Sequence, residues 1–151
     1  MKIKTAKIQD IKKMVAFSHE KRLQYSKIQA NFWKMADNSD EIQAEWFKEL
    51  LNDEAIIAFV ADEGFIIGKI INPPEVYDAG LTLMIDDFCV QNDDIWLTVG
   101  KNLLEKCIQS GKEKGAKQIL VVCGHHDKNK KELLDIMGLN IASNWYTNLL
   151  S

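Results

Sequence analysis

Two adjacent carboxylates, Asp86 and Asp87, lie inside an otherwise apolar stretch at residues 84–90. Because burying an unpaired carboxylate is costly, such a pair needs either a charged partner or a function, and a sheltered carboxylate is suited to proton abstraction. Period-two alternation along a strand places Asp86 on the same side as Val90 and points Asp87 the other way. A bulge in the strand would exchange the two. The alternative is that one or both acids are solvated or ion-paired.

The segment after this strand has the succession of turn and helix that is typical of a phosphate-binding site. A polar turn at residues 91–94 leads from the strand into an amphipathic helix expected from about Trp96 to Lys114. Free amide hydrogens in the first turn of a helix and the positive end of its dipole attract phosphate. Gly100 lets the backbone come close to a ligand there. The strand, turn and helix therefore predict an open phosphate cradle next to the acidic pair.

A second cluster, Cys123 with His125 and His126, could suggest a metal site or a catalytic thiol. Neighbouring side chains on an extended segment point in opposite directions, so only Cys123 and His125 could converge, and no second cluster has ligand spacing. We therefore expect no metal. Cys89, Cys107 and Cys123 are an odd number of thiols in apolar stretches, which favours reduced core residues over a disulfide framework or a nucleophile.

The N-terminal third of the chain predicts a strand followed by two helices. Polar and apolar residues alternate over residues 2–8, and Asp10 can cap the helix that follows. Asp40 with Gln43 resembles a capping box that opens a second helix, which ends near Asn52. The inward stripes expected for the two helices are Ile11, Met14, Val15, Ser18, Arg22 and Tyr25 for the first, and Ile42, Trp46, Phe47, Leu50 and Leu51 for the second.

The rest of the chain predicts a sheet covered by helices. Apolar runs at residues 55–61 and 65–71 flank a turn and predict a β-hairpin, and residues 118–123 predict a buried strand parallel to the acidic one through a helical crossover. Residues 128–137 predict a helix, and residues 140–150 a final strand or hairpin. The fold class is α/β (α+β), with a mixed, mostly antiparallel sheet, one parallel pair of strands, and helices on both faces.

Composition agrees with a single domain over residues 1–151. No apolar run approaches the roughly 20 residues of a membrane-spanning helix, and no secretory signal is evident, so we expect a cytoplasmic protein that does not bind membranes. A formal net charge of −3 leaves no basic footprint for nucleic acid. Nucleic acid is therefore not an expected partner.

The order of these elements resembles the GNAT superfamily of acyl-CoA N-acyltransferases over nearly the whole chain. Its phosphate loop has the form Arg/Gln-x-x-Gly-x-Gly/Ala, which falls here on residues 95–100. Gly100 matches that form, whereas Ile95 replaces the basic or amide position and Thr98 the middle glycine. The flanking segments that carry the resemblance further are residues 86–90, Leu103 with Leu104, Val121 with Val122, and residues 133–139.

The resemblance implies transfer of an acetyl group from acetyl-CoA to a primary amine by direct attack, with no covalent enzyme intermediate and no metal. We favour Asp86 as the base because the Val90 position of the family pairs with the acyl-CoA arm, and Asp87 is the alternative. Asp127 occupies the place of an asparagine that contacts the pantetheine arm, with capping of the following helix as the other interpretation. The implied cofactor-binding residues are Cys89, Val90, Trp96, Leu97, Thr98, Val99, Gly100, Lys101, Asp127 and Asn129.

Departures from the family pattern motivate an alternative. The tyrosine that commonly returns a proton to the thiolate is replaced by Leu134, so that Tyr146 or Tyr77 would have to substitute. Trp96 stands where the family has a small glycine, and Ile95 removes a basic side chain that Lys101 and other lysines would have to replace. The alternative is a catalytically inactive GNAT-like module that binds CoA or a partner protein.

The amine acceptor cannot be identified from the sequence beyond a small molecule or a peptide. In this fold the acceptor site is set by the first two helices and by the loop before the acidic strand, here residues 73–80. Tyr25, Phe32, Trp33 and Tyr77 could line an amine pocket or form a core under a long loop. An exposed final strand would also make a homodimer possible.

Overall fold

A single sheet with the strand order β1-β2-β3-β4-β5 forms the middle of the molecule. The computed structural model describes residues 1–151. All neighbouring strands are antiparallel except β4 and β5, which are parallel. The mixed sheet with one parallel pair is thus confirmed. The elements are β1 (Lys4–Thr5), α1 (Ile11–Ile28), α2 (Ser39–Leu51), β2 (Ile56–Ala61), β3 (Gly64–Ile71), β4 (Thr82–Val90), α3 (Lys101–Glu113), β5 (Gln118–Val121) and α4 (Lys128–Ile136).

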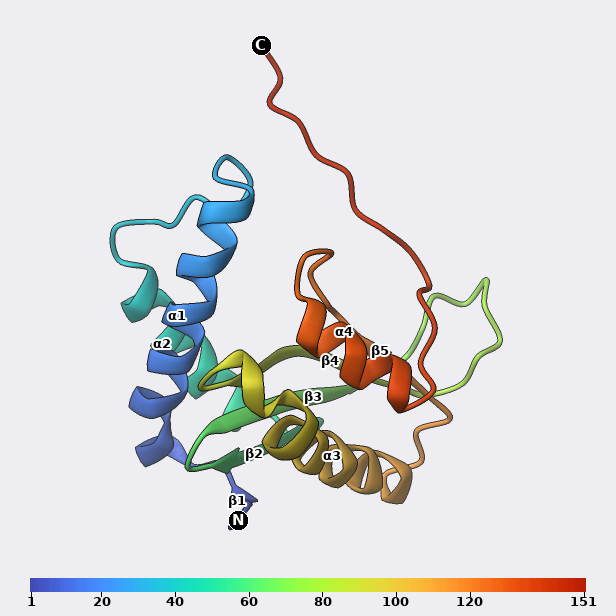
Figure 1. Cartoon of the computed structure of the whole chain (residues 1–151). Helices are drawn as coiled ribbons and strands as arrows, with labels where there is room; N and C mark the ends of the chain where they lie inside the picture. The colour runs from blue at the N-terminus through green and yellow to red at the C-terminus, as the bar shows by residue number, and fades with distance from the viewer.

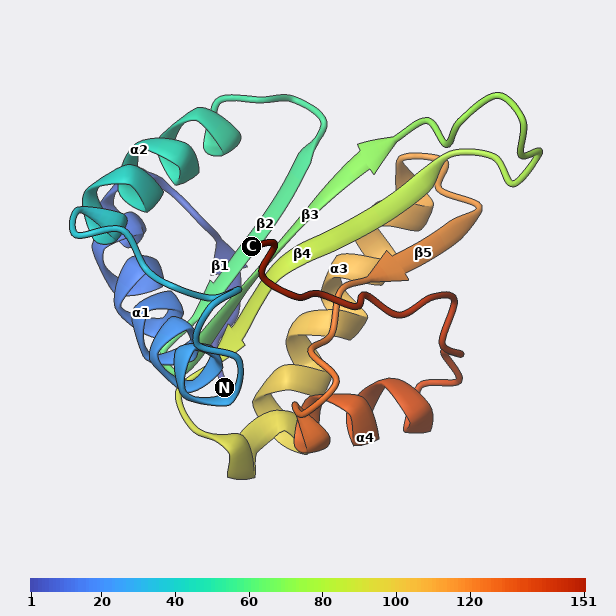
Figure 2. The ribbon, with the colours of Figure 1, turned by 90° about the horizontal axis from the view of Figure 1, so that it is seen from above.

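Helices cover both faces of the sheet, with α1 and α2 on one side and α3 and α4 on the other (Figures 1 and 2). Each side has its own apolar core. Met14 of α1 and Phe47 of α2 pack on the first face, whereas Leu103 and Cys107 of α3 and Leu133 of α4 pack on the second. The predicted helical cover on both faces is confirmed.

Strand β4 carries a bulge at the acidic pair, where it also parts from β5. Its register with β3 moves from Ile67 opposite Asp87 to Gly68 opposite Ile85, which leaves Asp86 as the extra residue. Pairing with β5 extends from Thr82 to Ile85, and the amide of Val122 makes the last bond of this ladder, to the carbonyl of Ile85 at 2.9 Å. From Asp86 onward, β4 is paired only with β3.

The segment between β4 and α3 is less regular than the sequence pattern predicts. Asp93–Ile95 form a turn of 3-10 helix, Trp96–Gly100 a π-helical turn, and the α-helix proper begins at Lys101 rather than at Trp96. A Cβ atom at Gly100 would lie 2.7 Å from Cε3 of Trp96. The glycine therefore makes room for the indole of its own helix, and its role toward a ligand stays a prediction.

Three further expectations about the elements differ from the structure. Residues 140–151 form no strand or hairpin; they run away from the body as an extended tail (Figure 1). In α2 the inward positions are Phe47 and Leu50, while Ile42 and Trp46 are 54% and 51% exposed. The first strand is confined to Lys4–Thr5 because Ile8 already belongs to a 3-10 turn. No helix combines the length and the apolarity that a membrane span needs.

Candidate active site

The bulge places both aspartates on the α1 and α2 side of the sheet. Ile85 and Phe88 both belong to the core under α3 and α4, so the two residues between them lie on the opposite face. Asp87 is paired with Ile67, whose side chain belongs to the core under α1 and α2. Asp86 is exposed, whereas Asp87 is half-buried. Our expectation that Asp86 shares a face with Val90 is therefore wrong, because the bulge breaks the alternation, whereas Asp87 does point away from Val90 as expected.

Asp87 has the electrostatics of a sheltered base. Burial and the neighbouring charge of Asp86 raise its pKa from 3.8 to about 6, against the opposing effect of Lys130 and Arg22. Its carboxylate is in no ion pair closer than 4.0 Å. A carboxyl group with a pKa near neutrality can accept a proton at physiological pH.

The backbone of β4 offers an unpaired edge beside Asp87. The amide of Gln91 donates to the carbonyl of Glu63 on the β3 side at 2.7 Å. Antiparallel alternation then directs the backbone groups of Cys89 toward β3 and those of Phe88 and Val90 toward the β5 side. Because β5 has already diverged, this edge is free to accept an extended ligand as an additional strand would.

A buried charged cluster lies between α1 and α4 at the open end of the split. The ammonium of Lys21 lies 3.3 Å from a carboxylate oxygen of Asp127 and 3.4 Å from one of Asp93. The hydroxyl of Tyr25 donates to Asp127 at 3.1 Å. Lys21 is 7% and Asp127 8% exposed. Lys21 is not among the predicted site residues, although its position between Ser18 and Tyr25 on the inward stripe of α1 indicated that its side chain would be buried.

Trp96 and Lys130 fill the space between this cluster and the sheet. Trp96 is 0% and Lys130 3% exposed. The ammonium of Lys130 lies 5.3 Å from the ring centre of Phe88 and 5.5 Å from that of Trp96, and the ammonium of Lys21 lies 5.3 Å from Trp96. The indole Nε1 of Trp96 has no hydrogen-bond partner. Two lysines thus pack on one indole, with cation–π contacts in place of ion pairs for Lys130.

The start of the α3 segment does not fit the diphosphate of a CoA ester. The side chain of Asn92 occupies the cap by accepting from the amide of Asp94 at 3.1 Å. Asp93 and Asp94 add two carboxylates at the helix end where an anion would bind, and Trp96 fills the place of a small residue. Like charges at such a short range repel a diphosphate. The predicted open cradle on residues 95–100 is therefore not what the side chains form.

The other expected cofactor residues divide between interior and surface. Cys89, Val90 and Val99 are buried, and Leu97 and Thr98 are exposed. The hydroxyl of Thr98 donates to the carbonyl of Ile95, and Lys101 lies 3.8 Å from Glu105. The structure thus brings the backbone of Val90, but not that of Cys89, to the free edge of β4, and turns Leu97 and Thr98 outward.

The predicted pair at the start of α4 makes contacts within the chain. The side-chain amide of Asn129 donates to the carbonyl of Asp93 at 3.0 Å. Asp127 stands at the N-cap position of α4, as our alternative expected, but its side chain makes no capping bond. Its carboxylate is held by Lys21 and Tyr25 instead, which leaves it less available to a ligand than the resemblance implies.

Neither tyrosine expected as a general acid lies in this region. Tyr146 is 93% exposed on the extended tail, and Tyr77 is 66% exposed on the loop before β4. The tail touches the body through Trp145, whose ring centre lies 6.4 Å from that of Phe32. The structure therefore does not bring Tyr146 to the other predicted site residues.

The cysteines are free thiols with the character of core residues. Burial raises the pKa of Cys89 to about 11 and that of Cys107 to about 12, and it also raises the pKa of Cys123. Thiols with raised pKa values are poor nucleophiles at neutral pH. Three metal-ligating side chains come together nowhere in the chain.

Three aromatic residues predicted for the acceptor pocket do meet. The ring centre of Trp33 lies 5.2 Å from that of Tyr25 and 4.6 Å from that of Phe32. Tyr77 is not part of this group. The aromatic group borders a hollow of about 230 Å³ between the second half of α1 and residues 29–38. This hollow lies on the same side of the sheet as Asp87.

No protein-family model and no curated protein matches this sequence, but solved structures match its fold. A point mutant of the BH1408 protein from Bacillus halodurans has a TM-score of 0.86 at 15% identity and covers 100% of both chains. A structure described as a predicted acetyltransferase with acetyl-CoA, from Clostridium acetobutylicum, has a TM-score of 0.74 at 15% identity, covering 98% of this chain and 95% of that one. The aminoglycoside N-acetyltransferase AAC(6')-Iy with CoA has a TM-score of 0.71 at 12% identity, covering 99% and 93%.

These likenesses define the class of protein at the level of fold. The chain has the GNAT fold, in which structural neighbours of nearly full length are acetyltransferases described with acetyl-CoA or CoA. Within that fold, β4 diverges from β5 after Ile85, β4 has its bulge at Asp86, and the segment before α3 is irregular. The fold that the resemblance implied is confirmed.

Proposed function

We propose that this chain is an N-acetyltransferase that transfers an acetyl group from acetyl-CoA to a primary amine by direct attack. The observation that carries the proposal is the free edge of β4 at Phe88 and Val90, which lies next to a carboxyl group with a pKa of about 6. The thioester supplies an activated acyl group when it is bound. The chain supplies position and a proton acceptor.

Asp87 is the residue to which we assign the base. A neutral amine is the nucleophile, so a proton must leave it, and Asp87 is ionised above a pH of about 6. General base catalysis of this kind contributes about 100- to 10,000-fold to a rate. Asp86, being exposed, keeps the electrostatic role of raising the pKa of its neighbour.

The fit to acetyl-CoA is divided between two ends of the site. The strand edge at Phe88 and Val90 fits the amide-bearing arm of the cofactor, because backbone donors and acceptors are unpaired there. The diphosphate end is acidic at Asp93 and Asp94. Phosphates would therefore have to use the exposed lysines Lys128 and Lys131 of α4, and we expect weaker binding than a basic loop would give.

A second candidate function is a GNAT fold that binds a ligand or partner without transfer. It is favoured by one specific observation, the complete burial of Trp96 at the position where the family pattern has a small glycine. Two lysine side chains lie over that indole, so the interior at this point is filled by the chain itself.

The two candidates are separated by calorimetric titration with acetyl-CoA and with S-acetyl-pantetheine, which lacks the diphosphate. The N-acetyltransferase proposal expects both to bind, with similar affinities because the diphosphate end contributes little. Incubation with acetyl-CoA and a panel of primary amines, followed by mass spectrometry, then tests transfer. Absence of binding by both thioesters would overturn the proposal and leave the second candidate.

A further inference from the structure

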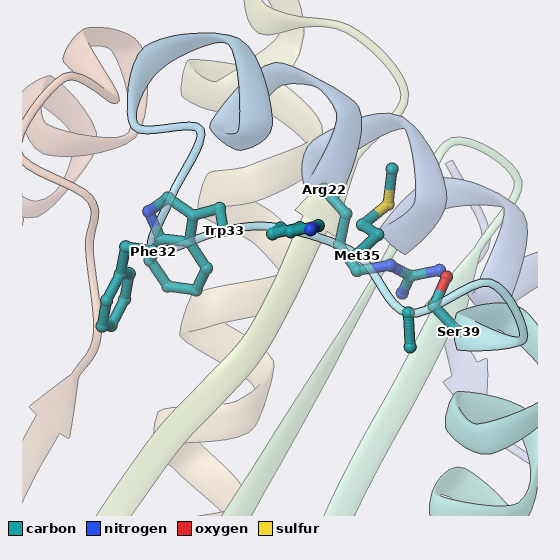
Figure 3. A pocket seen from close by; sticks show the side chains of 7 residues that line it. Arg22, Phe32, Trp33, Met35 and Ser39 are labelled. Carbon is teal, nitrogen blue, oxygen red and sulfur yellow. The ribbon is translucent and has the colours of Figure 1, made fainter. Parts of the chain in front are cut away.

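The hollow beside the aromatic group contains a guanidinium group. Its lining residues are Arg22, Phe32, Trp33, Lys34, Met35, Ala36 and Ser39. Figure 3 shows Arg22 with Met35 and Ser39 at one end and Phe32 with Trp33 at the other. One end of this space is therefore polar and cationic, and the other is apolar and flat.

Arg22 is the only arginine in a chain whose other basic side chains are lysines. Its Nη2 donates to Asp40, whereas Nε and Nη1 are buried without any hydrogen-bond acceptor. Buried donors without partners are costly, and a guanidinium cannot lose its charge to avoid that cost. The cost is removed when the guanidinium turns toward the hollow and a ligand there supplies acceptor oxygens. A planar fork of donors matches a carboxylate better than an ammonium does.

The charges around the hollow favour a single negative charge. Arg22 and Lys34 are cationic, and Asp40 is the one carboxylate that pairs with the guanidinium. His19, one turn earlier on α1, also contacts Asp40, at 2.9 Å. Arg22, Lys34 and Asp40 together carry about one positive charge, which suits a carboxylate and leaves a doubly charged phosphate only partly neutralised.

We propose that this hollow binds the carboxylate of an amino acid-like acceptor, with Arg22 on the carboxylate and Trp33 and Met35 along its apolar part. The inference rests on the proposed function and deepens it by naming the substrate class. Arg22 is close enough to Asp87 for its charge to lower the pKa of that carboxyl. The same proposal places the amine of such an acceptor toward Asp87.

The single arginine allows a direct test on the intact protein. Phenylglyoxal modifies arginine, and mass spectrometry of the Arg22 peptide measures the extent of modification. We expect protection by L-phenylalanine, L-leucine or 4-aminobutanoate, and none by the matched amines phenethylamine, isoamylamine and propylamine at equal concentration. Inorganic phosphate serves as the probe for a general anion site. Protection by no carboxylate, equal protection by a matched amine, or equal protection by phosphate would each overturn the inference.

A calorimetric comparison of variants adds a second readout. The affinity for a protecting amino acid falls by about 10- to 100-fold in Arg22→Gln, the range for a lost hydrogen bond to a charged group. Lys27→Gln is the matched control, because it removes one positive charge from an exposed position of the same helix and leaves the affinity unchanged. An equal loss in both variants would reduce the effect to net charge and overturn the assignment of Arg22.

Neither the protection experiment nor the calorimetry requires acetyl transfer. The carboxylate site and the transferase proposal can therefore be tested independently. If amino acids protect Arg22 but no amine is acetylated, the transferase proposal fails and the carboxylate site stands. If amines are acetylated with the same kcat/KM whether or not they carry a carboxylate, the transferase proposal stands and the carboxylate site is overturned.

Discussion

The two faces of β4 have opposite chemistry although they belong to one strand. Toward α3 and α4 its side chains, Phe88 and Val90 among them, join an apolar core that also holds Trp96. Toward α1 it presents Asp87, close to the charges of Arg22 and Lys130. The first face has the composition of an interior that stabilises the fold, and the second has unpaired or partly paired polar groups that a ligand would satisfy.

The same contrast separates the two regions that the family pattern assigns to ligands. At the start of α3, Trp96 is packed into the expected phosphate site, and the carboxylates of Asp93 and Asp94 lie in the turn just before it. Beside α1, a hollow of about 230 Å³ retains buried donors on Arg22 that have no acceptor. We infer that the diphosphate end of the acetyl-CoA site is occupied by packing, while the acceptor end keeps groups that can bind a ligand.

The largest effect is expected where the packing is densest. Trp96→Ala removes a fully buried side chain from the core under α3 and α4 and should lower the free energy of unfolding by about 3–5 kcal/mol. Trp46→Ala, at a tryptophan that is 51% exposed, is the matched control and should cost about 1 kcal/mol or less. Urea denaturation measures both. Equal losses of stability in the two variants would contradict our interpretation that Trp96 stabilises the core.

Asp87→Asn should separate catalysis from stability. The rate of acetyl transfer should fall by about 100-fold or more, because the amide cannot accept the proton. The wild-type pH–rate profile should rise with an apparent pKa of about 6, and this limb should be absent in the variant. Steady-state kinetics across pH 5–9 would be the measurement, and an unchanged profile would show that another group is the base.

The stability of the same variant has a predicted sign. The folded pKa of Asp87, about 6, lies above its unfolded value of 3.8, so the folded state binds the proton more tightly. Wild-type protein should therefore lose stability as pH rises through this window, by up to about 3 kcal/mol. Asp87→Asn should match the wild type near pH 4 and exceed it at pH 7, as urea denaturation at both pH values would measure. If the variant were less stable than the wild type at pH 7, the charged carboxylate of Asp87 would not destabilise the fold, and the raised pKa would be contradicted.

The buried cluster between the two regions should show an intermediate effect. Asp127→Asn leaves Lys21 with only Asp93 as a partner and should cost about 1–3 kcal/mol of stability. A double-mutant cycle with Lys21→Met measures the coupling, which burial should make insensitive to salt. A coupling near zero would mean that the contact in the structure does not stabilise the fold.

The smallest effect is expected at the acidic start of α3. Asp94→Asn removes an exposed carboxylate that has no ion-pair partner within 4.0 Å. If the diphosphate lies near this helix end, acetyl-CoA should bind about 2- to 5-fold more tightly to the variant, within the range of about 0.3–1 kcal/mol for a charge at a helix terminus. The affinity for S-acetyl-pantetheine should not change. Calorimetry with both ligands decides, and a parallel change for both would place the effect away from the diphosphate.

Several elements were predictable because their signals are local. The hairpin of β2 and β3 follows from two apolar runs around a turn, and the inward stripe of α1 follows from helical periodicity through Ile11, Met14 and Val15. The parallel pairing of β4 with β5 follows from the helix between them, since parallel neighbours require a crossover. Even the acidic pair was recognisable as unusual, because two carboxylates interrupt an apolar strand.

The residues of the candidate site were less predictable because their roles depend on distant neighbours. A one-residue bulge decides which aspartate is sheltered, and the alternation of the sequence carries no sign of it. The segment at residues 140–150, predicted as a final strand or hairpin, finds no partner strand within the chain. Whether Gly100 faces a ligand or the indole of Trp96 is a matter of packing, which spacing alone does not reveal.

The sequence by itself determined the order of the elements, the mixed sheet and its helical cover, because periodicity and turn residues act over a few neighbouring positions. Only the tertiary structure decided that Asp87 is the sheltered acid, that Lys21 reaches Asp127, and that the sole arginine is left with unpaired donors in a hollow. Burial, pKa and hydrogen-bond satisfaction are properties of groups brought together from distant parts of the chain. They exist only once the chain has folded.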